Sequence, residues 1–362
     1  MLKLRTFELL QAAIEEHAIE CEFRVNGGVN LIHRDLDVPM EQKWIGEVMS
    51  DQQLAQYRLE WWNETKVRAL YPRLSLENFG ATYEPNVASL HPIKLLDGLW
   101  RAATAAAADR VQLYCNVFVN DVAPRDPATG LLRITTSRGT VLAKKIVYCT
   151  NAYTQLLLPQ LEEIVVPRRG QVIYTDAQPQ FPAYNFSAFE DDHFCDYMIK
   201  RVPTDGLVFG GARVHSQHPR KEDGRLDDDS VEPNVASALR QELRDIIGDP
   251  FQVQNEWTGC MAYTPDERAL VGELPPQPRA PRVVADKHEA PIAFRPTGSG
   301  EYIFAGWCGN GMANIFSTSK EFVHALITEE WSTVPAELNC ARFLQATTQA
   351  EHVSTTADNP VL

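Results

Sequence analysis

Several features that define common protein classes are missing from this 362-residue sequence. No apolar run approaches the roughly 18 residues that a membrane span needs. Glu8, Glu15 and Glu16 interrupt the segment where a signal peptide would have its apolar core. There is no G-x-S-x-G elbow, P-loop lysine motif or H-E-x-x-H, so the hydrolase and NTPase classes lose their usual support. We therefore expect a cytoplasmic protein of another class.

Paired cysteines and surplus positive charge are also lacking. The seven cysteines are odd in number, scattered and never arranged as C-x-x-C, which predicts reduced thiols without a disulfide framework or zinc cluster. The net charge of -14 and the pI near 5.1 argue against phosphate backbones and anionic lipid, because both require clustered lysine and arginine. The expected partner is a small molecule, with no nucleic acid and no membrane.

Metal-capable side chains occur in three places, none with the spacing of a metal site. His215 and His218 have no third ligand nearby, and residues 191–193 read Asp-Asp-His in a predicted loop. The acidic run 227–229 lies between Gly224 and Pro233, which favours a solvated loop. No metal is predicted.

The most informative stretch that is present covers residues 302–313. An apolar run leads into three glycines within six residues, and apolar residues then recur at helical spacing. The pattern predicts a strand, a glycine loop and a helix. Such a junction brings backbone amides and the positive end of a helix close to a ligand, because glycine has no Cβ. Taken alone, it is equally compatible with a tight turn.

The length predicts about two domains, and the pattern alternates between helical and β segments. Helices are predicted at residues 3–19, 51–70, 92–107 and 233–247. Residues 21–25 and 29–32 are predicted to form an antiparallel pair, and 197–202 to pair with 207–213. Residues 111–149 have a β pattern that ends in a strand at 146–149 buried on both faces. Trp61 and Trp62 are predicted to be packing residues, 275–296 an irregular loop and 345–362 a disordered tail.

The sequence lacks a common dinucleotide-binding motif and yet resembles a known protein family. No G-x-G-x-x-G follows a predicted strand, so the usual pyrophosphate-binding turn of a dinucleotide fold is missing. Even so, eight segments in order resemble the D-amino acid oxidase-like FAD-dependent oxidoreductases, a group that includes glycine, sarcosine and γ-glutamylputrescine oxidases. The segments are FRVNGG (23–28), ASLHP (88–92), Val119 with TSRG (136–139), CTNAY (149–153), PRRGQ (167–171), DGLVFGG (205–211), WTG (257–259) through 272, and AGW (305–307) through GM (311–312).

The resemblance implies a mixed α/β fold and the residues that would border FAD. Residues 1–19, 85–164 and 300–332 would be the remnant of an N-terminally truncated FAD-binding domain, interleaved with an antiparallel-sheet substrate domain at 20–84 and 165–299 and followed by a tail at 333–362. The implied FAD-binding residues are Val119, Thr150, Asn151, Ala152, Gly306, Gly309, Asn310, Gly311 and Met312.

The sequence also departs from the family pattern. The opening strand, the glycine fingerprint and the ribose-binding acid are missing, as if about a hundred residues were removed. Met261 replaces the carboxylate-binding arginine of glycine-type oxidases, which argues against a small α-amino acid substrate. Cys260 lies one position from a site of covalent flavin attachment, and a buried core cysteine is the favoured interpretation. Asn310 and Ala269 replace a frequent histidine and proline.

The resemblance implies an oxidoreductase that oxidises an amine or amino acid C–N bond by hydride transfer to flavin, with oxygen as acceptor. No catalytic residue is assigned, and His91, Arg213, Met261 and Tyr263 are the substrate-side candidates. Two alternatives remain open: a non-catalytic truncated product that cannot hold FAD, and a glycine-loop module for another anion. Because the missing strand would leave apolar sheet edges unpaired, we expect the chain expressed alone to be poorly soluble and colourless.

Overall fold

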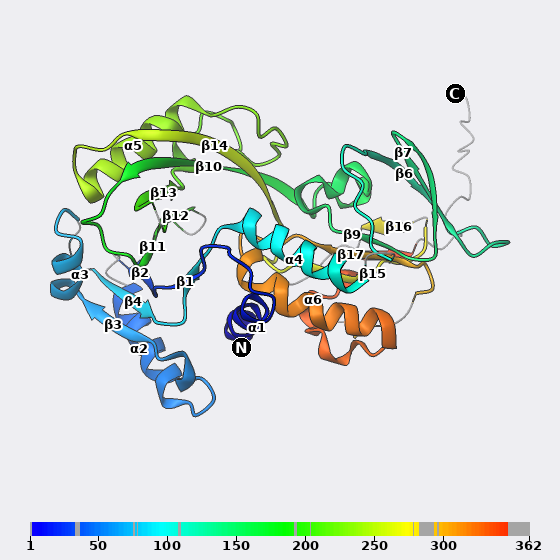
Figure 1. The fold of residues 1–362 in the computed structure, drawn as a ribbon, viewed down its shortest axis with the longest axis horizontal. Helices are drawn as coiled ribbons and strands as arrows, with labels where there is room; N and C mark the ends of the chain where they lie inside the picture. The colour runs from blue at the N-terminus through cyan, green and yellow to red at the C-terminus, as the bar shows by residue number, and fades with distance from the viewer. Residues whose placement is uncertain are drawn as a thin grey trace, which may run out of the picture. The chain divides into compact units, whose positions relative to one another are not determined.

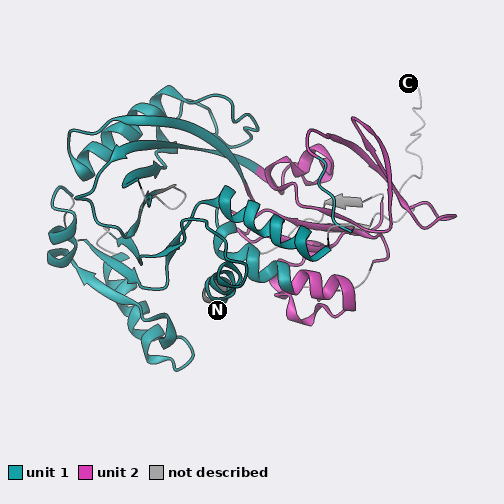
Figure 2. Cartoon of the chain, viewed as in Figure 1, with its two compact units in different colours: residues 1–114, 167–261, 309–320 teal, residues 115–166, 262–308, 321–362 magenta. Residues whose placement is uncertain are grey.

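The computed structural model describes residues 2–32, 37–74, 77, 79–107, 110–191, 194–202, 204–277, 279–281, 293–294 and 297–346. The fold mixes helices and sheets, as the sequence predicts (Figure 1). The chain divides into two compact units, shown in teal and magenta in Figure 2. Unit 1 comprises residues 1–114, 167–261 and 309–320, and unit 2 comprises 115–166, 262–308 and 321–362. The assignment of segments to a cofactor domain and a substrate domain stays a prediction.

Unit 1 is built on an eight-stranded sheet with the strand order β14-β10-β13-β12-β11-β2-β4-β3. Neighbouring strands for which a register is defined run antiparallel, except β11 and β2, which are parallel. The strands are β2 (Gly28–Ile32), β3 (Glu60–Asn63), β4 (Gly80–Glu84), β10 (Val166–Ala177), β11 (Asn185–Asp191), β12 (Phe194–Lys200), β13 (Gly206–Gly210) and β14 (Val253–Tyr263).

One face of this sheet forms the main hydrophobic core with α3 (Glu64–Leu70) and α5 (Pro233–Ile247). Helix α5 begins at a proline, and the Glu232 carboxylate before it accepts a hydrogen bond from the backbone N–H of Val235 (2.7 Å). Its residues Val235, Leu239 and Leu243 recur every four positions and are fully buried. The amphipathic spacing of the helix therefore fixes which of its faces meets the sheet.

The remaining helices of unit 1 have smaller contact surfaces. Helix α2 (Asp37–Ser50) packs Ile45 and Val48 against Leu59, near the 3₁₀ helix η1 (Ala55–Tyr57). Helices α1 (Leu2–Glu16) and α4 (Pro92–Ala107) share another small core, beside the short pair β1 (Arg24–Val25) and β5 (Ala88–Ser89). The 3₁₀ helix η4 (Arg213–His215) follows β13.

Unit 2 contains a three-stranded sheet with the order β15-β17-β9. Strand β17 (Glu301–Ala305) is entirely buried, lies antiparallel to β15 (Leu270–Glu273) and runs parallel to β9 (Ile146–Tyr148). Helix α6 (Gly311–Thr328) crosses the boundary of the units, and its unit 2 residues Phe322 and Ala325 join the core on this sheet. An antiparallel meander is formed by β6 (Val119–Ala123), β7 (Leu132–Thr136) and β8 (Gly139–Ala143). A further pair consists of β16 (Arg279–Pro281) and β18 (Leu344–Ala346). The 3₁₀ helices of the unit are η2 (Asn151–Leu156), η3 (Pro159–Leu161), η5 (Trp331–Thr333), η6 (Ala336–Leu338) and η7 (Cys340–Arg342).

Each unit contains a buried charged group with hydrogen-bond partners. In unit 2 the Glu301 carboxylate accepts hydrogen bonds from the Tyr148 hydroxyl (2.7 Å) and from the Gln277 amide (3.2 Å). In unit 1 the Arg169 guanidinium, 2% exposed, pairs with Glu222 at 2.6 Å and with Asp227 at 2.8 Å. Asp227 is therefore anchored, whereas the sequence predicted only a solvated loop at 227–229. Removing one partner of such a buried pair leaves an uncompensated charge, which is strongly destabilising.

Several predictions from the sequence are confirmed. Helix α5 has the predicted bounds, α4 begins at the predicted proline, and β12 pairs with β13. The stretch around the glycine loop is a strand, a loop and a helix. Trp62 is 4% exposed and its ring stacks on that of Tyr83, with 4.3 Å between ring centroids.

Other predictions are wrong. The helix predicted at 51–70 is interrupted by β3, because Trp61 and Trp62 favour a strand that pairs with β4. The segments 21–25 and 29–32 do not pair with each other: β1 pairs with β5, whereas β2 pairs with β4 and β11. Residues 111–115 form no strand, and Leu113 is 62% exposed. Alternation predicts an extended backbone but carries no information about the partner strand.

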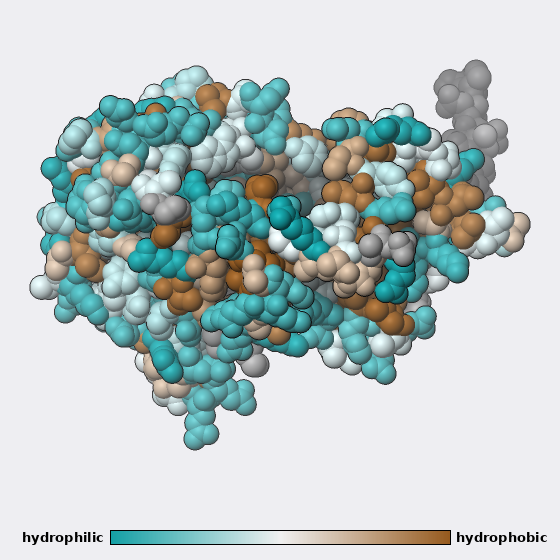
Figure 3. Space-filling view, in the orientation of Figure 1, coloured by the Kyte–Doolittle hydropathy of each residue, from teal (hydrophilic) through white to brown (hydrophobic). Residues whose placement is uncertain are grey.

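Two predicted segments extend beyond what the structure describes. Most of the irregular loop predicted at 275–296 and residues 347–362 of the predicted tail lie outside the described residues. In the described part of the chain no helix is long and apolar enough to cross a bilayer. Hydrophobic residues show in brown at several places on the face drawn in Figure 3, and large exposed side chains include Phe118, Leu142 and Ile327.

The burial of Leu239 in α5 predicts the effect of a substitution there on the stability of the fold. Leu239→Ala removes a fully buried side chain from the main core, so we expect the free energy of unfolding to fall by about 2–5 kcal/mol. The control is Ser237→Ala at an exposed position of the same helix, with an expected change of under about 0.5 kcal/mol. Denaturant unfolding monitored by circular dichroism measures both. Equal effects of the two substitutions would show that α5 does not contribute this face to the core.

Candidate functional site

The candidate site begins where β17 ends, at a loop whose backbone requires glycine. Gly306 has φ +75°, and a Cβ placed on it would lie 3.0 Å from Thr264 Cγ2 and 3.1 Å from Leu270 Cδ1. Cys308 and Gly309 also have positive φ values, +50° and +73°. Gly306 is thus fixed both by its backbone conformation and by the close approach of two side chains.

The side chain of Asn151, the first residue of η2, holds this glycine loop in unit 2. The Asn151 side-chain oxygen accepts a hydrogen bond from the backbone N–H of Gly306 (3.0 Å) and a longer one from that of Trp307 (3.5 Å). Asn151 has φ +41°, a left-handed conformation that asparagine tolerates better than most residues. The structure therefore brings together two loops that the resemblance places beside FAD.

The neighbours of Asn151 stabilise its turn. The hydroxyls of Thr150 and Thr154 lie 2.9 Å apart, and the Thr154 hydroxyl donates to the Asn151 carbonyl oxygen (2.7 Å). Ala152 is 1% exposed, so it supports the turn from inside unit 2. Of these predicted cofactor residues, Asn151 is the one whose side chain contacts the glycine loop through hydrogen bonds.

Cys308 anchors the glycine loop through its backbone N–H and its thiol. Its backbone N–H donates to the Ala262 carbonyl (2.8 Å), and its Sγ lies 3.2 Å from the Gly306 carbonyl oxygen and 3.4 Å from the backbone nitrogen of Thr264. Burial raises the pKa of the Cys308 thiol, which favours the neutral form. A buried neutral thiol is a packing residue rather than a nucleophile.

Beyond Cys308 the chain enters unit 1 and starts α6. Gly309 and Asn310 are exposed, Gly311 is the first helical residue, and Met312 is 54% exposed. The first N–H groups of a helix have no intrahelical acceptor and carry partial positive charge. These residues can therefore stabilise an anion or an electron-rich ring edge.

The other predicted residues lie on separate elements. Val119, the first residue of β6, is 39% exposed and belongs to the meander rather than to the β15-β17-β9 sheet. His91 precedes α4, and its Nδ1 atom is buried without a hydrogen-bond partner among the described residues. Arg213 opens η4 and is 8% exposed. Tyr263 is the last residue of β14.

Met261 and Cys260 lie in β14, and their surroundings in unit 1 argue for packing roles. A Cβ placed on Gly170 of β10 would lie 3.1 Å from the terminal methyl of Met261. Cys260 is half-buried, not buried as predicted, and its Sγ lies 3.9 Å from the Asp227 carbonyl. His215 pairs with Glu242 at 3.4 Å, and Asp192 and His193 lie outside the described residues. No group of three metal-capable side chains occurs where the chain is described.

Sequence reasoning missed an ion pair that fixes the turn after β14. The Arg342 guanidinium binds the Asp266 carboxylate in bidentate fashion, at 2.7 and 3.1 Å, and the Thr264 hydroxyl lies 3.1 Å from the same carboxylate. Burial works to raise the pKa of Asp266, but the hydrogen bonds and charge of Arg342 hold it below its usual value. No local signal could reveal this pair, because its members are 76 residues apart.

A model of one protein family matches nearly the whole chain: DAO, FAD-dependent oxidoreductase, over residues 2–325. The chain belongs to this family. Among curated proteins, the probable oxidoreductase OrdL of Haemophilus influenzae is 23% identical over 289 residues, which are 76% of this chain and 60% of that protein. The chain thus spans 60% of the length of this relative.

Solved structures of low sequence identity share the fold of this DAO-family chain. L-proline dehydrogenase from P. horikoshii is 17% identical with a TM-score of 0.72, and the match covers 94% of this chain and 82% of that chain. Glycine oxidase from Geobacillus kaustophilus is 19% identical with a TM-score of 0.69, over 93% and 81% of the two chains. The predicted family and fold class are confirmed.

The residues present fit one end of FAD. In unit 2, a glycine with no space for a Cβ, held by Asn151, lets a flat ring approach the backbone closely. In unit 1, the start of α6 favours negative charge. The sequence contains no G-x-G-x-x-G turn for the pyrophosphate end. The fit therefore concerns the ring end of the cofactor.

The hydrogen bonds of Asn151 predict how substitutions at this position affect stability. Asn151→Ala removes the acceptor of two backbone N–H groups, so we expect the free energy of unfolding to fall by about 1–3 kcal/mol. Asn151→Asp keeps an acceptor oxygen and a residue type that tolerates positive φ, and it should retain most of the stability. Thermal unfolding of both variants measures the difference. If Asp and Ala were equally destabilising, the hydrogen bonds would not be what holds the loop.

The Asp266–Arg342 pair makes a prediction about pH. Since the pKa of Asp266 is lowered in the folded state, its contribution is present above the ordinary aspartate pKa of about 4 and is lost as pH falls through the folded value. Asp266→Asn should cost about 1–3 kcal/mol at neutral pH and progressively less in acid. Asp97→Asn, in an exposed pair with Arg101, is the control and should change little. A cost of Asp266→Asn that does not depend on pH would contradict the role of its charge.

Proposed function

We propose that this DAO-family protein oxidises a C–N bond of an amine or amino acid with FAD as cofactor and oxygen as acceptor, in a reducing compartment such as the cytoplasm. Family membership supports the cofactor. The single observation that carries the proposal is the hydrogen bond from Gly306 N–H to Asn151, because it joins two loops expected to border the flavin. Several similar structures are named as enzymes that act on amino acids, which supports the substrate class.

In this proposal the FAD-binding residues are Val119, Thr150, Asn151, Ala152, Gly306, Gly309, Asn310, Gly311 and Met312. When bound, the flavin supplies the acceptor for a hydride from the carbon that carries the amine. The chain supplies electrostatics: the first amides of α6 favour negative charge at the edge of the ring. Asn151 keeps the Gly306 amide in place, so the loop needs no reorganisation when charge develops.

The residues expected to contact the substrate include no assigned acid or base and no charged partner for a carboxylate at position 261. A neutral amine needs no side chain to remove a proton before it reacts, so no acid or base is assigned. His91, Arg213, Met261 and Tyr263 remain the substrate-side candidates. Because Met261 packs toward Gly170 and carries no charge, it cannot pair with a substrate carboxylate. We therefore propose an amine substrate without a carboxylate bound at this position.

A second candidate function is that of a non-catalytic family member that does not retain FAD. Two observations favour it. The sequence contains no G-x-G-x-x-G turn, and among the described strands β9 pairs on one side only, with β17. An open sheet edge leaves backbone hydrogen-bonding groups without a ladder partner and promotes association. This candidate predicts a colourless, poorly soluble chain.

Flavin absorbance distinguishes the two candidates. Under the proposed function, the purified 362-residue chain retains added FAD in a one-to-one yellow complex, and an amine panel bleaches the flavin without oxygen and consumes oxygen in air. Gly306→Ala should lower FAD affinity at least about tenfold, because a Cβ there meets Thr264 and Leu270. Gly259→Ala is the control, since a Cβ there has open space. A folded chain that binds no FAD supports the non-catalytic candidate, and one that binds another anion instead supports a third, an anion-binding glycine loop.

A further inference from the structure

A cavity of about 560 Å³ lies in unit 1, and none of the residues that line it is assigned to FAD. Its floor is formed by four neighbouring strands of the large sheet, β12, β11, β2 and β4, and α2 contributes to its wall. Its size is that of pockets for small organic molecules. The lining residues are Gly28, Val29, Asn30, Glu41, Trp44, Leu59, Thr82, Glu84, Val87, Ala88, Asn185, Phe186, Ser187, Tyr197 and Ile199.

The strand register explains why this face of the sheet is polar. Asn30 lies opposite Thr82 on one side and beside Ser187 on the other, and Ser187 lies opposite Tyr197. Because side chains alternate along each strand, these four point to the same face. The residues between them point to the opposite face and belong to the main core: Val29, Ala81, Phe186 and Met198. A polar row across four strands is thus set by the same pairing that builds the core.

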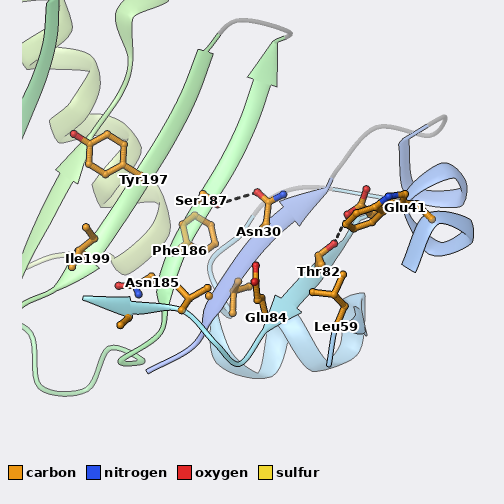
Figure 4. A pocket seen from close by; sticks show the side chains of 15 residues that line it. Asn30, Glu41, Leu59, Thr82, Glu84, Asn185, Phe186, Ser187, Tyr197 and Ile199 are labelled. Atoms are coloured by element: carbon orange, nitrogen blue, oxygen red, sulfur yellow. Dashed lines mark hydrogen bonds between the residues drawn. The ribbon is translucent and has the colours of Figure 1, made fainter. Parts of the chain in front are cut away.

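The lining carries two negative charges. Both come from glutamates, Glu41 of α2 and Glu84 of β4, and the fifteen lining residues include no lysine, arginine or histidine. The Thr82 hydroxyl donates to Glu41 at 2.7 Å, which ties α2 to the polar face, as the dashed line in Figure 4 shows. Glu84 follows two positions after Thr82 on the same face, about 7 Å along the strand. Two carboxylates therefore flank one threonine.

Aromatic and apolar groups complete the lining. Trp44 and Tyr197 are 48% and 39% exposed, and each can accept a cation over its face. Leu59, Val87 and Ile199 supply apolar surface. The cavity thus combines fixed negative charge, aromatic faces and an apolar wall.

One hydrogen-bond acceptor at the lining is left without a partner. The Ser187 hydroxyl donates to Asn30 (2.9 Å), and the Asn185 amide nitrogen donates to Asn26 (3.1 Å). The Asn185 side-chain oxygen is buried and accepts no hydrogen bond within the described part of the chain. This acceptor at the lining, together with the carboxylates, favours a ligand that brings N–H donors.

We propose that this cavity binds an organic cation, a protonated amine on an apolar chain, and discriminates against carboxylates. The ammonium would lie between Glu41 and Glu84 with Trp44 and Tyr197 beside it, and the chain would lie against Leu59, Val87 and Ile199. The charge of the lining repels an anion of the same shape. The inference needs no flavin, because every residue that carries it lies in unit 1 and none is assigned to the cofactor.

The test uses three probes of equal length that differ in charge: hexylammonium, 1-hexanol and hexanoate. Isothermal titration calorimetry or ligand-observed NMR at neutral pH measures each against the purified chain. We expect one hexylammonium site with affinity at least about tenfold above that of hexanol, and no detectable binding of hexanoate. Equal affinities for ammonium and alcohol would overturn the proposal, as would binding of hexanoate.

Variants then locate the site. Glu84→Gln removes one charge at nearly constant shape and should weaken hexylammonium binding by about tenfold while leaving hexanol unchanged. Glu47→Gln is the matched control, because Glu47 lies on α2, is exposed and does not line the cavity. If both variants weakened binding equally, the attraction would come from the overall charge of -14 and the cavity proposal would fail. A chain that binds hexylammonium but no FAD would support this inference and contradict the proposed function, so the two outcomes are separable.

Discussion

Two backbone N–H groups that share one side-chain oxygen hold a loop in which Gly306, Cys308 and Gly309 all have positive φ values. Gly306 and Trp307 both point their amides at Asn151, and each end of this contact is in a conformation that few residues tolerate. The glycine loop has no regular secondary structure of its own, so it depends on Asn151 at the start of η2. Burial of Cys308 and its hydrogen bond to Ala262 fix the end of this loop within unit 2.

A different constraint governs unit 1, where strand register divides one sheet into two chemical environments. A shift of one residue in β2 would move Asn30 into the apolar core and expose Val29 to the cavity. The same hydrogen-bond ladder therefore maintains both the main core and the polar row. Such a slip is costly, because Val29 and Leu31, which are 1% and 2% exposed, would both have to leave the core.

The sequence allowed the glycine junction to be predicted because its signals are local: an apolar strand, glycines and helical spacing fall within about twenty residues. Helix α5 was predictable for the same reason, with a proline at its start and regular apolar spacing. Helix α2 was missed because Ile45 and Val48 are its buried residues and give too weak a periodicity. Asn151 was assigned to the site by resemblance, but its contact with Gly306 spans 155 residues and no local pattern contains it. The polar row was not predicted because it exists only once four strands are in register.

The parallel pairing of β2 with β11 has a consequence for how the protein is made. Residues 28–31 pair with 185–188, so this part of the sheet cannot form until residue 188 has left the ribosome. Before that, β4 can pair with one edge of β2, but Val29 and Leu31, both nearly fully buried in the finished sheet, lack the core residues Phe186, Met198 and Leu207. Contacts between residues so distant in sequence also slow folding, because a long loop must close before any of them is formed. One edge of β2 therefore stays unpaired during much of synthesis, and an open strand edge of this kind is a site where a chaperone could protect the nascent chain from association.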